Sequence, residues 1–180
     1  RSSDLIDNLN IAPADDSRTL SEGTTGTGSV NLLFMLDVST SMRESVSGTT
    51  RLAIMKDALE NLIDKYDSAA DIKGIQIVTF ADSATALSGS DSFWLTVSEA
   101  KTYISSLSTS NYTDYDSAIE KLMTTYSSST PPVADNTYGY FLSDGEPLGS
   151  DDNNSNAIST AEQTVWQNWL AGTAINEVYA

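Results

Sequence analysis

The stretch that decides the fold is VNLLFMLDVSTSM, residues 30–42. It opens with a nearly continuous apolar run, residues 30–36, which is typical of a strand buried on both faces of a parallel sheet. The run stops at Asp37, and Ser39 and Ser41 follow at alternate positions, so their side chains point the same way if the segment stays extended. Ligands of open α/β sheets bind beyond the carboxyl ends of the strands, so these three residues mark a candidate site.

Outward from this strand, apolar runs alternate with segments of helical periodicity. Ser98 is predicted to cap one helix and Gly172 to end the last one. The alternation predicts an α/β fold, with a doubly wound, mostly parallel central sheet flanked by helices on both faces. The predicted helices cover residues 51–66, 98–107, 115–126 and 158–170, and the further strands lie at 75–81, around 93–95, at 138–142 and from 175 onward.

One domain of ordinary size accounts for most of the 180 residues. Residues 1–28 are rich in Asp, Ser, Thr and Gly and are predicted to be a linker from a preceding module. Residues 29–180 are predicted to form the domain. The first residue is Arg1, which suggests a piece excised from a larger protein.

The composition excludes several classes of function. With 25 acidic and 9 basic residues and a net charge of −16, the surface repels phosphate backbones and anionic lipid, so we expect no nucleic acid partner. No apolar stretch approaches 18 residues, so we expect no membrane insertion either. Cysteine and histidine are both absent, which excludes disulfides, thiolate and Ser-His-Asp chemistry and the usual zinc sites. Any metal must therefore bind to oxygen.

A second carboxylate is expected at the same edge of the sheet. The strand at 138–142 ends in Ser143-Asp144-Gly145, so Asp144 is expected to lie beyond the carboxyl end of a neighbouring strand. Carboxylate and hydroxyl oxygens suit hard divalent cations.

These residues resemble the metal-ion-dependent adhesion site (MIDAS) of the von Willebrand factor type A and integrin inserted domains. That motif is Asp-x-Ser-x-Ser followed by a distant Thr and a distant Asp. The resemblance covers residues 30–180 and implies the same fold, although the last elements of the family fold are missing, so the domain is either truncated or completed by another segment. The metal ligands that the resemblance implies are Asp37, Ser39, Ser41, Thr113 and Asp144.

Thr113 is the ligand with the weaker match. It lies in residues 111–119, which resemble the Gly-Gly-Thr segment that opens a helix in the family. Asn111 and Tyr112 replace the two glycines, so the loop has less backbone freedom. A helix cap is an equally good interpretation of Thr113 from the residues alone.

The resemblance implies a divalent-cation-dependent adhesion or protein-interaction module. One cation, Mg²⁺, Ca²⁺ or Mn²⁺, would complete its shell with a carboxylate from a protein ligand or a host or cell-surface component. Residues 93–100, 113–115 and 140–147 are similar to A domains of bacterial RTX-type adhesins. This similarity implies a large secreted or surface-anchored bacterial protein, with adjacent modules in the same chain, outside the cell or on its surface.

Two alternatives remain. One is a structural A domain whose ion only stabilises the fold. The other is a Mg²⁺-dependent, haloacid dehalogenase-like phosphatase with Asp37 as nucleophile. That enzyme needs a second Asp where this chain has Ser39, and it needs a lysine or arginine at the strand ends, where we expect none. We therefore expect no enzymatic activity.

Residues 152–156 begin with the spacing of a calcium-binding EF-hand loop. Ala157 replaces the required glycine, and Gln163 stands where the bidentate Glu belongs. We interpret this segment as a solvated loop.

Overall fold

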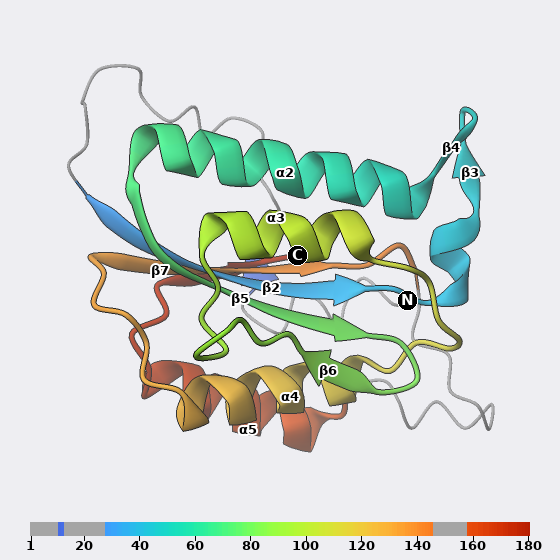
Figure 1. Cartoon of the computed structure of the whole chain (residues 1–180). Helices are drawn as coiled ribbons and strands as arrows, with labels where there is room; N and C mark the ends of the chain where they lie inside the picture. Colours follow the sequence, from blue (N-terminus) through green and yellow to red (C-terminus); the bar gives the residue numbers. More distant parts are fainter. Residues whose placement is uncertain (1–10, 13–27, 146–157) are drawn as a thin grey trace.

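The computed structural model describes residues 11–12, 28–145 and 158–180. Its central feature is a six-stranded sheet with the strand order β1-β8-β7-β2-β5-β6 (Figure 1). In chain order the elements are β1 (Ile11–Ala12), β2 (Ser29–Asp37), the 3₁₀ turn η1 (Thr40–Arg43), β3 (Ser45–Val46), β4 (Thr49–Thr50), α2 (Arg51–Ala69), β5 (Asp71–Phe80), β6 (Ala84–Ala86), α3 (Val97–Ser106), α4 (Tyr115–Ser128), β7 (Asn136–Leu142), α5 (Thr160–Ala171) and β8 (Glu177–Tyr179).

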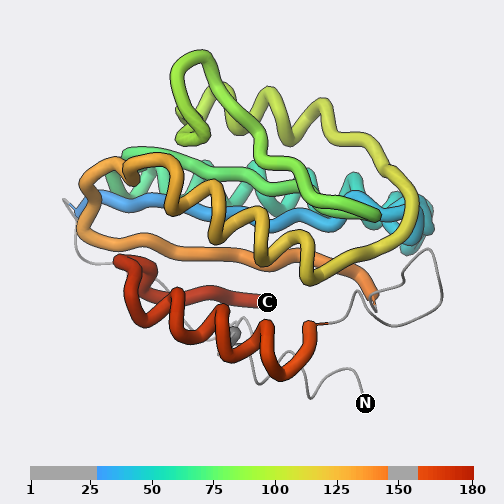
Figure 2. The backbone as a smooth tube through the Cα atoms, turned by 90° about the horizontal axis from the view of Figure 1, so that it is seen from below, coloured from blue at the N-terminus to red at the C-terminus, as the bar shows by residue number. Residues whose placement is uncertain are grey.

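The sheet is mostly parallel, as predicted. All neighbouring pairs run parallel except β5 and β6, which are antiparallel. Helices α2 and α3 cover one face, and α4 and α5 cover the other (Figure 1). Figure 2 shows α4 and α5 side by side across their face. The structure confirms the predicted doubly wound α/β fold.

Strand β2 lies in the interior of the sheet, and its side chains are buried on both faces. Leu33 and Met35 pack toward α4 and α5, whereas Leu32, Phe34 and Leu36 join the cluster under α2 and α3. This placement explains the unbroken apolar run, because a strand covered by helices on both sides has no solvent-facing position.

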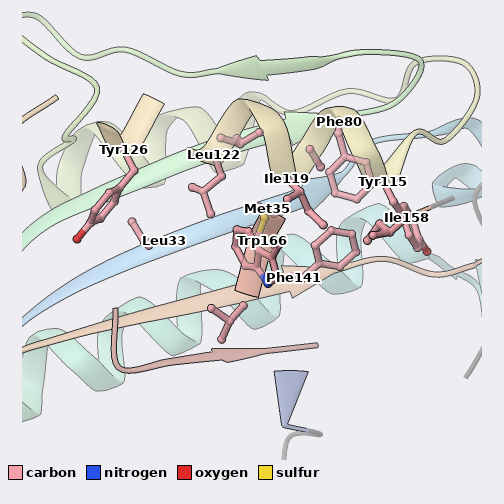
Figure 3. Close-up of a cluster of buried hydrophobic side chains, with 13 residues drawn as sticks. Leu33, Met35, Phe80, Tyr115, Ile119, Leu122, Tyr126, Phe141, Ile158 and Trp166 are labelled. Atoms are coloured by element: carbon pink, nitrogen blue, oxygen red, sulfur yellow. The ribbon is translucent and has the colours of Figure 1, made fainter. Parts of the chain in front are cut away.

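A compact aromatic group lies under the carboxyl ends of β2, β5 and β7 (Figure 3). Phe141 lies 5.1 Å from Phe80 and 5.0 Å from Tyr115 between ring centroids, and all three side chains are buried. Such offset and edge-to-face pairs contribute roughly 0.5–1.5 kcal/mol each beyond their buried area. The group fixes the ends of two strands and the start of α4, which carry the candidate site.

Side-chain caps set the starts of the helices. The Thr50 hydroxyl accepts from the Ala53 amide at the start of α2. Helix α3 begins with a capping box of Thr96 and Glu99, so the predicted cap, Ser98, was wrong. The structure favours Thr96 because Glu99 stands three residues after it and bonds back to the Thr96 amide. Gly172 is the C-cap of α5, as predicted.

The edge of the sheet beyond β5 differs from the prediction. Residues 93–95 form no strand, and only an isolated antiparallel bridge joins Leu95 to Ile75. The cap at Thr96 starts α3 directly after this bridge, which leaves no room for a longer pairing. The strand at this edge is instead Ala84–Ala86. With three residues and small side chains, it is too short to show an alternation of apolar and polar positions in the sequence.

The other edge of the sheet is formed by a segment from near the N-terminus. Ile11 and Ala12 pair in parallel with Val178 and Tyr179 of β8. These two residues belong to the range predicted as a linker, and the rest of that range, apart from Gly28, lies outside the described residues. A separate segment thus adds a strand beside β8. The boundary at residue 29 stays a prediction.

Within the described residues, no helix is both long enough and apolar enough to cross a membrane.

Candidate metal centre

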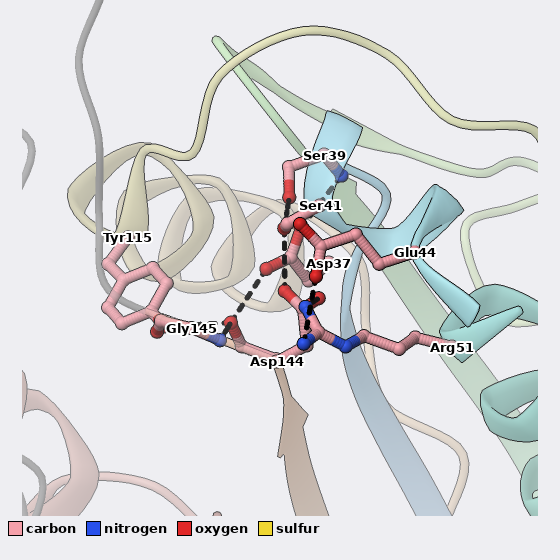
Figure 4. Close-up of polar contacts among 9 residues, drawn as sticks. Asp37, Ser39, Ser41, Glu44, Arg51, Tyr115, Asp144 and Gly145 are labelled. Carbon is pink, nitrogen blue, oxygen red and sulfur yellow. Dashed lines mark hydrogen bonds and ion pairs between the residues drawn. The ribbon is translucent and has the colours of Figure 1, made fainter. Parts of the chain in front are cut away.

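The two predicted carboxylates leave the sheet at the same edge. Leu36 of β2 pairs with Leu142 of β7, so Asp37 and Ser143 follow at the ends of adjacent parallel strands. Asp144 is the next residue, and Figure 4 shows it close to the segment that carries Asp37 and Ser41. The prediction that Asp37 and Asp144 lie at the same edge of the sheet is confirmed.

Asp37 is fully buried, with 0% of its surface exposed. Its carboxylate accepts from the Ser39 amide at 2.8 Å and from the Ser143 hydroxyl at 2.6 Å. Burial raises the pKa of Asp37, the hydrogen bonds from Ser143 and Ser39 lower it, and the nearby Asp144 raises it further. No ion pair reaches Asp37 from any residue in the described ranges 11–12, 28–145 and 158–180. A buried carboxylate without a counter-charge is costly, so this position favours a bound cation.

The serine hydroxyls form a short chain from the first loop to Asp144 (Figure 4). The Ser39 and Ser41 Oγ atoms are 2.9 Å apart, and Ser41 Oγ donates to Asp144 Oδ1 at 2.7 Å. Adjacent ligands of an octahedral Mg²⁺ with bonds of about 2.0–2.1 Å are about 2.9 Å apart. The two distances are ordinary hydrogen-bond lengths, and they also match the spacing of neighbouring ligands of one small cation.

Thr113 reaches the site on the loop before α4. Backbone bonds hold this loop, because the Ser110 amide donates to Val38 O at 2.6 Å and the Asp114 amide donates to Ala81 O at 2.7 Å. Thr113 is buried and lines the same pocket as Ser41. The helix cap is Asp114, whose carboxylate accepts from the Ser117 amide, so the interpretation of Thr113 as a cap was wrong.

Tyr112 adopts the backbone conformation that a glycine would favour. Its φ is 54°, in the left-handed region, where a side chain costs roughly 1–2 kcal/mol. The loop thus keeps its bend without the glycines that the family places there. The Tyr112 side chain is exposed at the rim of the pocket.

A pocket of about 510 Å³ opens above these groups. Asp37 and Ser39 lie below it, among the buried residues. Its lining brings together parts of the chain more than 90 residues apart: Thr40, Ser41, Arg51, Asn111, Tyr112, Thr113, Asp144 and Gly145.

The sequence reasoning missed Arg51, Glu44 and Tyr115. The expectation of no lysine or arginine at the strand ends was wrong, because Arg51 donates to Asp144 Oδ2 at 2.6 Å and pairs with Glu44 at 3.0 Å. Arg51 is the first residue of α2, and this position after the serine loop was the available signal. Tyr115 bonds with Ser143, which in turn bonds with Asp37, and also donates to Gly145 O. No sequence pattern marked that connection.

The residues present fit a hard divalent cation. Two carboxylates and the hydroxyls of Ser39, Ser41 and Thr113 are all oxygen donors from three separate loops. Among the described residues, no group of three acidic side chains is placed to hold a metal ion, so the hydroxyls beside Asp37 and Asp144 are the further side-chain oxygens available at this site. The EF-hand-like segment at 152–156 lies outside the described residues.

Comparison with solved structures finds the same fold in proteins of low sequence identity. The von Willebrand factor domain of the type V pili tip protein Mfa5 from Porphyromonas gingivalis is 19% identical, with a TM-score of 0.52, and covers 69% of this chain and 40% of its own. An aerotolerance-related membrane protein from Bacteroides fragilis is 21% identical, with a TM-score of 0.56, over 77% of this chain and 62% of its own.

A third similar structure is that of a protein with a bound metal. Proximal thread matrix protein 1 from the mussel byssus, described with a zinc-occupied MIDAS motif, is 18% identical, with a TM-score of 0.60, over 85% of this chain and 35% of its own. The chain thus spans well under half of the Mfa5 and mussel protein structures. No curated protein sequence matches it.

The solved structures show the fold, and comparison with protein families shows the family. Residues 32–146, more than half of the 180, match the von Willebrand factor type A domain. The match runs from β2 to the residue after Gly145 and so includes all five predicted ligands. The chain belongs to the von Willebrand factor type A domain family.

Proposed function

We propose that this domain is a divalent-cation-dependent adhesion module whose metal centre is formed by Asp37, Ser39, Ser41, Thr113 and Asp144. The observation that carries the proposal is the buried Asp37 carboxylate, which hydrogen bonds hold in place but no ion pair within the described residues neutralises. A protein with a net charge of −16 would raise the local concentration of such a cation.

The protein groups leave part of the cation's shell for another molecule. The Ser39 and Ser41 hydroxyls can bind the cation directly, and Asp37 and Asp144 supply the negative charge. The backbone bond from the Ser110 amide to Val38 O holds the loop that carries the two serines. The bound cation would attract a carboxylate that enters the 510 Å³ pocket above it. The partner is thus a protein or cell-surface group with an exposed Asp or Glu.

The biological setting is proposed from two sources. The resemblance of residues 93–100, 113–115 and 140–147 to RTX-type adhesins supports a large, secreted or surface-anchored bacterial protein. A pilus tip protein among the structures of the same fold supports an adhesive role outside the cell.

The zinc-occupied MIDAS motif of the mussel protein supports a metal in this domain as well. An ion that also stabilises the fold is compatible with this role.

We propose no enzymatic activity. Ser39 occupies the position where a phosphatase of the haloacid dehalogenase class needs its acid and base, and a serine hydroxyl, which does not ionise near neutral pH, cannot replace a carboxylate there. Arg51 does lie at the strand ends, but both its partners are carboxylates of this chain. Hydrolysis of an aryl phosphate that disappears in Asp37→Asn would contradict this view.

Binding to acidic peptides tests the adhesive function. Peptides with one central Asp or Glu are immobilised beside matched peptides with Asn or Gln, and domain binding is measured in Mg²⁺, Mn²⁺ or EDTA. We expect a subset of acidic peptides to bind only with metal, and the amide partners to bind roughly tenfold more weakly or worse, since a charge-assisted contact is lost. Equal binding in EDTA would rule out the metal as the docking point.

A further inference from the structure

Arg51 connects the candidate centre to the first turn of α2. One guanidinium nitrogen donates to Asp144 Oδ2 at 2.6 Å, and the other pairs with Glu44 at 3.0 Å (Figure 4). The Asp144 side chain is only 10% exposed, whereas the Glu44 side chain is 65% exposed. Arg51 therefore makes one contact inside the site and one at its rim.

The inner contact uses an atom of a predicted metal ligand. Asp144 Oδ1 accepts from Ser41, and Oδ2 accepts from Arg51, so each carboxylate oxygen already has one donor. The guanidinium thus supplies Asp144 with the positive charge that a metal would otherwise supply. Asp37 has no such substitute among the described residues.

We propose that Arg51 competes with the divalent cation for Asp144 and so sets the metal affinity of the site. The proposal rests on the proposed metal centre. A dication near Asp144 repels the guanidinium and weakens its contact, because like charges a few ångströms apart in a partly buried pocket are poorly screened. Arg51 then stays paired with Glu44 and remains at the rim of the pocket.

A supporting role would have the opposite consequence. If Arg51 mainly orients Asp144 for the metal, as an outer-shell group does, its loss weakens metal binding. If it competes, its loss strengthens metal binding. The sign of the change distinguishes the two roles.

Calorimetric titration with Mg²⁺ and with Mn²⁺ tests the proposal on wild type and Arg51→Gln. We expect Arg51→Gln to bind metal roughly fivefold more tightly, the scale of a partly exposed ion pair. Arg51→Lys should be intermediate, because a single ammonium cannot bridge both carboxylates as the guanidinium fork does. The matched control is Lys101→Gln, since Lys101 lies on α3, forms an ion pair with Asp64 away from the site and should leave affinity unchanged.

A second measurement checks the ion pair without metal. In EDTA, thermal melts of Arg51→Gln, Asp144→Asn and the double variant should give a non-additive result, because each single change already removes the Arg51–Asp144 contact. Additive melts, or an Arg51→Gln that binds metal no more tightly than wild type, overturn the competition. If wild type and every variant bind no metal while the melts remain non-additive, the proposed metal centre itself fails.

Discussion

Asp37→Asn is expected to abolish the stabilisation of the domain by Mg²⁺ without lowering its stability in EDTA. A ligand present at a hundredfold excess over its Kd stabilises the native state by about 2.7 kcal/mol. For a domain of this size that raises the Tm of wild type by roughly 5–11 °C. The variant should show no metal-dependent change, because the cation loses one of the two carboxylates that attract it.

The behaviour in EDTA follows from the burial of Asp37. Its folded-state pKa is raised, so near neutral pH the ionised group destabilises the metal-free fold. Asparagine keeps the shape and removes that charge, so its Tm in EDTA should equal or exceed that of wild type. Differential scanning fluorimetry with and without Mg²⁺ measures both effects. Asp57→Asn, at an exposed position on α2, is the control. A metal-dependent shift that survives in Asp37→Asn would exclude this site.

Phe141→Ala is expected to cost the most stability of any change near the site. Its buried ring packs between Phe80 and Tyr115, and truncation of a buried Phe costs about 3–5 kcal/mol. This corresponds to a Tm lower by roughly 6–20 °C. Because Phe141 precedes Asp144 by three residues, the loosened strand end should also weaken metal binding.

Urea denaturation measures the free energy of unfolding of this variant. The control is Val133→Ala, whose side chain is 93% exposed and should change stability by less than about 0.5 kcal/mol. A loss below about 1 kcal/mol in Phe141→Ala would mean that the aromatic group does not anchor the strand ends.

The parts that could be predicted from the sequence are those governed by local patterns. The run at 30–36 indicated a doubly buried strand because helices on both faces leave no polar position on it. Asp37, Ser39, Ser41 and Asp144 were brought together by one rule, that parallel strands end at a common edge. The hydrogen bonds of Ser41 with Ser39 and Asp144 support that placement.

Other features depend on contacts between segments far apart in the sequence. Arg51 looked like an ordinary first residue of an amphipathic helix, and only the fold brings it to Asp144. Strand β6 was missed because Ala84–Ala86 is short and lacks large side chains, so its pairing with β5 leaves no apolar pattern. The pairing of Ile11 and Ala12 with β8 spans nearly the whole chain. Local patterns carry no information on such pairings.

The most direct test of the metal centre is a crystal structure of the domain grown with Mn²⁺, with anomalous diffraction recorded to locate the ion. We predict one Mn²⁺ within bonding distance of the Ser39 and Ser41 hydroxyls and beside Asp37, with Arg51 withdrawn from Asp144. An anomalous map without a peak at this position, in crystals soaked at saturating Mn²⁺ and with Asp37 buried as here, would contradict the proposed function.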